Sequence, residues 1–507
     1  MLAGFLIAWL LISALSVLWS FATPIAAAPD EPAHMVKAAA VVRGELLGTP
    51  GPDGTPVTVP QYIAYTHAQT CTAMNDSVTA NCLPAVPGDP DRIVGSATTA
   101  GLYNPLYYVM VGWPTLLFDD SSGVYAMRVV SAVIASGFLA LAAMLLLTWR
   151  RRALPLVAFG AAITPMVLFL NGSVNPNSVE IAATLAAFIA VTTVVMRAPE
   201  RIPASAAAVA AVSGVVAANM RGLSPLWLAV ALLAPFLLAG RPQILAIVRS
   251  WRVRISVIVI AAGVGFALAW LLISNSLGSH TDLPDDRPVV PYLGSSPITG
   301  FLLMLARTGS QLQEMIGRFG WMDTAAPVEV YAVWTLLIGG LVVGALVLTR
   351  GRRLLYAGAL AAAFLLLPAL AQAAFISGGG FIWQGRYSLP LLVVLLVGCG
   401  VALSERFDIA EARTRRILAV GVCTAWAAAQ TYVFAATLHR YAVGVDGSWP
   451  DAFLAPQWAP PGGMLLLTIA FAATAALGSV LAYRLLHRRG GLGLPHPLAE
   501  DAVGKTA

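Results

Sequence analysis

The hexapeptide Pro29-Asp30-Glu31-Pro32-Ala33-His34 places two adjacent carboxylates and a histidine directly after the first long apolar run, residues 2–28. Charge is costly near hydrocarbon, so ionisable side chains at a membrane boundary usually serve a function. A carboxylate there could act as a general base toward a hydroxyl group. Asp30 could also cap a helix beginning at Glu31, with His34 one turn away. A helix-capping role would account for Asp30, but it would not explain why Glu31 and His34 lie beside it.

Other ionisable side chains lie near the expected outer ends of the apolar runs, and we interpret them as lining one shared polar cavity. For a single arginine the alternative is that it reaches the headgroups separately. Arg386 is the candidate phosphate ligand, because a guanidinium can hold two phosphate oxygens at once; its alternative role is an interfacial anchor. The expected substrate- or phosphate-binding residues are His34, Arg128, Glu180, Arg221, Asp323, Gln384, Arg386 and Tyr387, beside the catalytic candidates Asp30 and Glu31.

Glu180 follows a turn rich in amide side chains, residues 171–177. It would either orient a ligand or pair with a nearby arginine, and the sequence favours neither role.

The composition indicates which elements must position these side chains. Of the 507 residues, 58% are hydrophobic and 11% are charged, against about 25% charged in an ordinary soluble domain. The formal charge of +6 could suggest nucleic acid. The arginines, however, occur as short clusters between apolar runs, which excludes a nucleic-acid surface and indicates a protein of the lipid bilayer.

The apolar runs predict an all-α polytopic membrane protein with about twelve spans, each needing roughly 20 residues. Basic loops stay cytoplasmic, which places both termini in the cytoplasm. We expect one membrane-embedded domain over residues 1–487, with outer loops at about 28–121, 275–328 and 438–461, and a disordered cytoplasmic tail at 488–507. The first run could instead be a cleaved signal peptide. It lacks a basic start and exceeds the ~7–15 apolar residues of that class, so we expect a retained anchor.

Four cysteines are present. Cys71 and Cys82 both fall in the first outer loop, where an oxidising compartment would favour a disulfide; two free thiols are the alternative. Cys399 and Cys423 lie in apolar spans and are expected to be packing residues.

Several short motifs, in their order along the chain, resemble the bacterial multi-pass membrane family known as domain of unknown function 2142. The resemblance extends from about Leu2 to Ala436. That family in turn resembles the GT-C superfamily of membrane glycosyltransferases, which carry an acidic motif in the first outer loop and use polyprenyl-phosphate sugars. The resemblance implies a GT-C-like fold with a large first extracytoplasmic loop, and a catalytic acid or base at Asp30 or Glu31. The motifs are Pro29–His34, Asn104–Tyr108, Asn175–Asn177, Phe319–Asp323 and Gln384–Tyr387.

For the activity, the resemblance implies a bacterial plasma-membrane glycosyltransferase. It would move a sugar from a polyprenyl-phosphate donor to a cell-envelope glycan or lipid acceptor on the extracytoplasmic face. A divalent metal, Mg²⁺ or Mn²⁺, fits the acids but no ligand spacing requires one. The alternative class is a transporter or flippase of lipid-linked glycans without covalent chemistry, which predicts ionisable groups or broken helices near the bilayer midplane. A structural partner in envelope assembly would need no acid pair.

Overall fold

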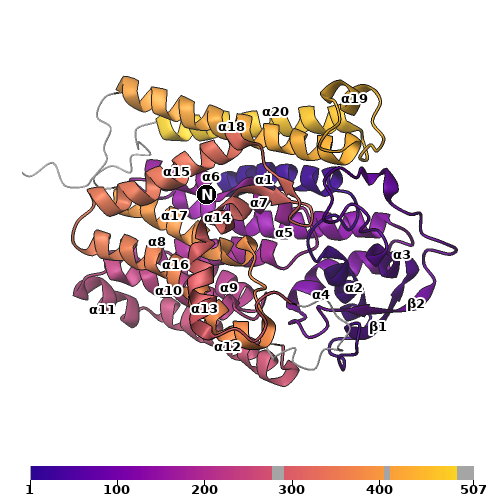
Figure 1. The fold of residues 1–507 in the computed structure, drawn as a ribbon. Helices are drawn as coiled ribbons and strands as arrows, with labels where there is room; N and C mark the ends of the chain where they lie inside the picture. Colours follow the sequence, from indigo (N-terminus) through magenta and orange to yellow (C-terminus); the bar gives the residue numbers. More distant parts are fainter. Residues whose placement is uncertain (1, 277–289, 405–411, 488–507) are drawn as a thin grey trace, which may run out of the picture.

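Long apolar helices dominate the computed structural model, which describes residues 2–276, 290–404 and 412–487 (Figure 1). The expected tail at 488–507 lies outside the described residues. Within these ranges nine helices are long and apolar enough to cross a membrane, or ten if one bent pair counts as a span. The nine are α1 (Leu2–Ala22), α5 (Ser122–Leu146), α8 (Asn177–Arg197), α12 (Trp251–Ser274), α15 (Val328–Leu348), α16 (Arg352–Gly379), α17 (Leu389–Leu403), α18 (Ala412–Val443) and α20 (Met464–His487).

The prediction of an all-α polytopic membrane protein is therefore confirmed, but the count of about twelve spans is not. Two predicted spans, at 203–219 and 225–239, correspond to shorter apolar helices. The shorter helices are α2 (Glu31–Val41), α3 (Gln61–Ala64), α4 (Leu106–Gly112), α6 (Ala153–Ala162), α7 (Pro165–Asn171), α9 (Ala204–Ala218), α10 (Ser224–Leu233), α11 (Arg241–Arg249), α13 (Pro297–Ala306), α14 (Thr308–Gly317) and α19 (Trp449–Leu454), with 3₁₀ turns η1 (Tyr65–His67), η2 (Ala80–Cys82), η3 (Trp113–Leu116), η4 (Ala234–Leu238) and η5 (Gly385–Ser388).

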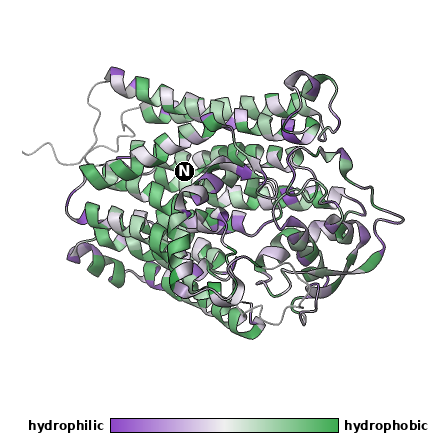
Figure 2. Cartoon of the chain, in the orientation of Figure 1, coloured by the Kyte–Doolittle hydropathy of each residue, from purple (hydrophilic) through white to green (hydrophobic). Residues whose placement is uncertain are grey.

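The centre of the bundle is formed by α8 and α17, which other helices enclose on nearly all sides. By contrast, α12, α15 and α20 leave most of their apolar surface facing outward. Figure 2 shows this hydrophobic surface along the helices, with polar residues concentrated toward the helix ends and in the loops. Such a distribution suits a bundle in lipid, because a helix satisfies its backbone groups internally and can expose apolar side chains to the acyl chains.

The pair α6–α7 is bent by 61° at the residues that precede Pro165. A proline cannot continue the α6 hydrogen-bond ladder. The indole N–H groups of Trp426 and Trp334 donate to the carbonyls of Gly160 and Ala161, at 2.9 and 3.0 Å. The amide of Gln430 likewise donates to the Ile163 carbonyl at 3.0 Å. Side chains of neighbouring helices thus pair the carbonyls that the bend frees from the ladder.

A cap, residues 23–121, covers one end of the bundle (right in Figure 1). It contains α2 and the antiparallel pair β1 (Thr55–Pro60) and β2 (Ile93–Thr98), with Thr55 opposite Thr98. Cys71 and Cys82 form a disulfide within it, with Cα atoms 6.1 Å apart. A second, short hairpin, β3 (Arg318–Phe319) with β4 (Thr324–Ala325), lies between α14 and α15.

Candidate functional site

Asp30 lies in the turn between α1 and α2, with its backbone in the left-handed region at φ 59°. A residue other than glycine is strained there, and such strain persists only where the surroundings hold it. The Asp30 side chain does not cap α2, so the capping prediction is wrong. The left-handed conformation takes its carboxylate away from the first turn of the helix and leaves it available for other partners.

Glu31 is fully buried and forms an ion pair with Arg128 of α5. Arg128 donates to both carboxylate oxygens, with Nε to Oε1 at 2.7 Å and Nη2 to Oε2 at 2.6 Å. The Val174 N–H donates to Oε1 at 3.0 Å. The remaining Arg128 N–H groups donate to the carbonyls of Ser20, Thr23 and Pro24. This closed network corrects the prediction that Arg128 binds substrate, and it leaves Glu31 no accessible oxygen for catalysis.

Asp30 pairs instead with Arg386, in the 3₁₀ turn η5 that precedes α17. The Asp30 side chain is 44% exposed, whereas that of Arg386 is fully buried. Arg386 Nη2 donates to Asp30 and, at 3.3 Å, to the Tyr387 hydroxyl. Its Nε and Nη1 are buried and have no hydrogen-bond partner among the described residues. Burial opposes ionisation of Asp30, but the guanidinium charges of Arg386 and Arg221 outweigh it and hold the pKa of this carboxyl below its usual value.

The loop that carries Arg386 is held by α14. The Gly385 N–H donates to Glu314 Oε2 at 2.6 Å. A Cβ atom on Gly385 would lie 2.5 Å from the Gln311 carbonyl oxygen, so only glycine allows this approach. Burial raises the pKa of Glu314, while the Gly385 N–H lowers it in part. Sequence reasoning missed Glu314, because a single acid on a short amphipathic helix resembles any solvated residue.

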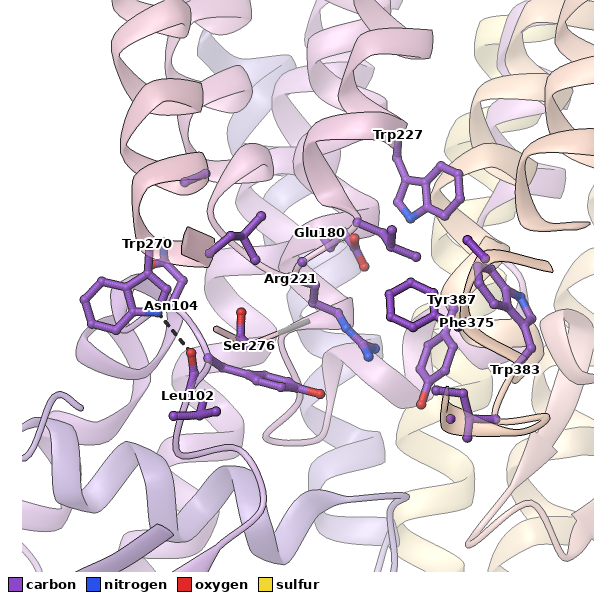
Figure 3. Close-up of a pocket in the computed structure, with 18 of the residues that line it drawn as sticks. Leu102, Asn104, Glu180, Arg221, Trp227, Trp270, Ser276, Phe375, Trp383 and Tyr387 are labelled. Carbon is purple, nitrogen blue, oxygen red and sulfur yellow. Dashed lines mark hydrogen bonds between the residues drawn. The ribbon is translucent and has the colours of Figure 1, made fainter. Parts of the chain in front are cut away.

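A cavity of about 560 Å³ lies beside this pair. Arg221 reaches into it, and its guanidinium points toward the side lined by Tyr387, Trp383, Phe375 and Trp227 (Figure 3). The Arg221 guanidinium carbon lies 4.2 Å from the centre of the Tyr387 ring, and that of Arg386 lies 5.2 Å from the same centre. Tyr387 therefore links the cavity to the Asp30–Arg386 pair, neither member of which lines it.

The prediction of one cavity shared by all the ionisable residues is thus only partly right. Glu180, Arg221 and Tyr387 line the cavity. Gln384 does not, and its side-chain oxygen is buried without a hydrogen-bond partner among the described residues.

His34 is buried on α2, and its Nδ1 lies 2.9 Å from the Tyr108 hydroxyl. Burial lowers the pKa of His34 to about 3, although the neighbouring Asp30 opposes the shift. His34 is therefore neutral near pH 7 and can exchange hydrogen bonds, but it brings no charge to a phosphate.

Asp323 belongs to a different cluster, between the β3–β4 hairpin and the disulfide loop of the cap. It accepts from the Met74 N–H at 2.9 Å and lies 3.8 Å from Arg440 of α18. Arg440 also donates to the carbonyls of Thr72, Asn75 and Val78. These contacts join α18 to the cap, which corrects the prediction that Asp323 binds substrate.

The acids do not form a set of metal ligands. In the part of the chain that the structure describes, no group of three or more His, Cys, Asp or Glu could hold a metal ion. Glu31 has both oxygens bound by Arg128, and Asp323 lies in the Arg440 cluster. We therefore derive no step that passes through a metal.

Comparisons with known proteins place the chain in a family. No curated protein matches it. Among solved structures, the apo state of ArnT from Cupriavidus metallidurans is similar at 14% identity, with a TM-score of 0.38, covering 95% of this chain and 76% of that chain. The model of the family described as "Predicted membrane protein (DUF2142)" matches residues 14–395. This match covers most of the chain and confirms the resemblance seen in the sequence motifs, so the protein belongs to this family of predicted membrane proteins.

Proposed function

We propose that the protein is a membrane glycosyltransferase that moves a sugar from a polyprenyl-phosphate donor to a glycan or lipid acceptor of the cell envelope. The observation that carries the proposal is the partly exposed carboxylate of Asp30, which lies one side chain away from an amphiphilic cavity. A lipid-linked sugar needs both a cation for its phosphate and apolar walls for its chain. The cavity offers Arg221 for the phosphate and aromatic side chains for the chain.

The apolar walls support a donor that arrives from the bilayer. Trp270 and Leu271 of α12 and Phe375 of α16 line the cavity. The next residues of α12, Leu272 and Ile273, are 83% and 73% exposed on the outward side of the bundle. A cavity wall formed by a helix that also faces lipid suits a ligand whose chain remains in the membrane.

The proposed reaction depends on two polar groups, the Asp30 carboxylate and the Arg221 guanidinium. The Asp30 carboxylate takes the proton of an acceptor hydroxyl, whose oxygen attacks the anomeric carbon of the donor. The bond from that carbon to the phosphate oxygen breaks, and the lipid phosphate leaves with the electron pair. Arg221 stabilises the charge that develops on the phosphate. Arg386 holds Asp30 in place through Nη2, while its Nε and Nη1 have no hydrogen-bond partner among the described residues. Protonated Asp30 then returns its proton to water.

The proposal also includes the orientation of the protein across the membrane. Basic loops at the ends of the helices opposite the cap would remain in the cytoplasm. The cap, Asp30 and the cavity then face the extracytoplasmic side of the plasma membrane, and both termini are cytoplasmic.

Asp30→Asn tests the proposal, with Asp119→Asn as the matched control at an exposed acid of the cap. Cells carrying each variant are compared for envelope glycans and lipid-linked sugars by mass spectrometry. Asp30→Asn should lower glycan transfer by about 10²- to 10⁴-fold and cause lipid-linked sugar to accumulate, whereas Asp119→Asn should behave as the wild type. A folded Asp30→Asn protein with full glycan content would refute the assignment.

The alternative class, a transporter or flippase, predicts a broken helix, and α6–α7 is one. Its freed carbonyls are paired by Trp334, Trp426 and Gln430, and neither helix contributes a residue to the cavity. The break therefore does not favour transport. The assay separates the two classes, because a transporter leaves the sugar on its lipid and transfer releases the lipid phosphate.

A further inference from the structure

The turn Asn175-Pro176-Asn177, which leads into α8, has no role in the mechanism above. Its three residues lie between the two halves of the site. We propose that this turn is a positioning element that holds the acid through Asn175 and the cavity guanidinium through Asn177, with Glu180 as its anchor. The inference rests on the proposed function and assigns Glu180 a positioning role rather than contact with a ligand.

Asn175 fixes the backbone on which Asp30 sits. Its Nδ2 donates to the carbonyl of Pro29 at 3.2 Å, directly before Asp30. The preceding N–H, that of Val174, donates to Glu31 Oε1 at 3.0 Å, directly after Asp30. Asn175 is buried, with 1% of its surface exposed. The turn thus holds both neighbours of Asp30, which is what a residue strained in the left-handed region requires.

Asn177 fixes Arg221. Its Oδ1 accepts from Arg221 Nη1 at 2.6 Å, and its Nδ2 donates to Glu180 Oε2 at 3.0 Å. A carboxylate only accepts and a guanidinium only donates, so these two charged partners determine which end of the Asn177 amide faces which. Because Glu180 holds the amide nitrogen, the amide oxygen always faces Arg221.

Glu180 is itself fully engaged. Its Oε1 accepts from the Ser224 hydroxyl at 2.6 Å, and the same hydroxyl accepts from the backbone N–H of Arg221 at 2.9 Å. Only 1% of the surface of Glu180 is exposed. Glu180 therefore holds both the backbone and, through Asn177, the guanidinium of Arg221.

The two asparagines are also joined to each other, because the Asn177 N–H donates to Asn175 Oδ1 at 3.0 Å. The acid and the guanidinium come from distant parts of the chain, yet both are held by one short turn. Because the Asn175 side chain donates to the acid side and that of Asn177 accepts from the guanidinium side, the loss of each should have a different measurable effect. Loss of the Asn177–Glu180 side should weaken binding of the phosphate, and loss of the Asn175 side should slow transfer without weakening binding.

The Glu180→Gln and Glu180→Leu pair tests the binding side, because both variants remove the charge. Only Gln can still accept from Asn177 Nδ2, and its own amide N–H can donate to the Ser224 hydroxyl. Titration calorimetry on the full-length protein in detergent would compare farnesyl phosphate with farnesol, which lacks the phosphate. We expect Glu180→Gln to bind farnesyl phosphate at least as tightly as the wild type. Glu180→Leu should bind it about tenfold more weakly, with farnesol binding unchanged in both. Asn177→Leu, which keeps the overall charge pattern, should behave as Glu180→Leu does and is the second variant if Glu180→Leu does not fold.

Equal affinities of Glu180→Gln and Glu180→Leu for farnesyl phosphate would overturn the inference, because the charge alone would then matter. Asn175→Leu tests the other side: its affinity for farnesyl phosphate should equal that of the wild type, while sugar transfer falls about tenfold or more. If Asn175→Leu weakens binding as much as Glu180→Leu, or leaves transfer intact, the inference also fails. A wild-type protein that binds farnesyl phosphate no better than farnesol would instead refute the proposed function, and the positioning role with it.

Discussion

Two arginine–carboxylate pairs begin at adjacent residues of one chain turn and differ in almost every other respect. Arg128 uses all five of its N–H groups, two on Glu31 and three on backbone carbonyls of the turn. Arg386 bonds through Nη2 alone, and its Nε and Nη1 have no partner in the described ranges. Both side chains of the first pair are fully buried, whereas Asp30 of the second is 44% exposed.

This difference separates a structural pair from the pair that we propose to be reactive. A saturated, buried pair is costly to open, because removing one partner leaves an uncompensated charge. A pair with an exposed acid and unused donors can exchange partners when a ligand arrives. The first pair therefore holds the turn between α1 and α2, and the second presents Asp30 beside the cavity.

The largest expected effect is on stability, from Arg128→Met. The substitution leaves Glu31 buried and unpaired and removes the donors to Ser20, Thr23 and Pro24, at a cost of about 3–5 kcal/mol. Thermal unfolding in detergent, followed by tryptophan fluorescence, would show a lower midpoint or loss of folded protein. A midpoint equal to that of the wild type would remove the structural role assigned to this pair.

Arg386→Met should reduce sugar transfer strongly and stability only slightly, the reverse of what we expect for Arg128→Met. Asp30 can be hydrated once its partner is gone, so we expect the stability cost to stay below about 2 kcal/mol. Transfer should fall about 10²-fold, because Asp30 loses the guanidinium that holds it in place. The same unfolding experiment and a transfer assay give both numbers. Destabilisation as large as that of Arg128→Met would show that the two pairs are alike after all.

A smaller effect is expected from Glu314→Leu, which takes the acceptor from the Gly385 N–H. Arg386 would lose its fixed position, and transfer should fall about tenfold, the cost of one hydrogen bond to a charged group. Glu314→Gln keeps an acceptor and should lie between the wild type and Glu314→Leu. Gln313→Leu, at the exposed neighbouring position, is the control. If both leucine variants transfer equally well, Glu314 does not position Arg386.

The smallest effect is a pH dependence of stability. The pKa of Asp30 is lower in the folded protein than its unfolded value of about 3.9. Its ionised form therefore adds stability above pH ~3.9, and this contribution is lost as the pH falls through the folded pKa. Between pH ~5 and ~3 the unfolding midpoint of the wild type should decrease more than that of Asp30→Asn. Parallel decreases in the two proteins would mean that Asp30 is not stabilised as a carboxylate.

The sequence alone predicted the membrane class, the family and the two residues of the Asp30–Arg386 pair. Asp30 and Arg386 stand out because charge is rare at a membrane boundary. The sequence did not distinguish the role of Asp30 from that of Glu31. A sequence cannot show that a left-handed backbone directs two adjacent acids to different partners. It also gave Asp323 a ligand role, because the sequence does not show that Arg440 approaches it across more than a hundred residues. The count of about twelve spans was not confirmed, because apolar helices such as α9, with 15 residues, are shorter than the roughly 20 residues that a span needs.

Arg440 limits how far the chain can be shortened from its C-terminal side. The family match ends at residue 395, before α18 begins. Yet Arg440, on that helix, supplies the donors for three carbonyls of the disulfide loop. A fragment trimmed to the matched region would leave those carbonyls without donors and Asp323 without its cation. The smallest piece of this chain worth expressing therefore extends through α18, whatever boundary a comparison of sequences suggests.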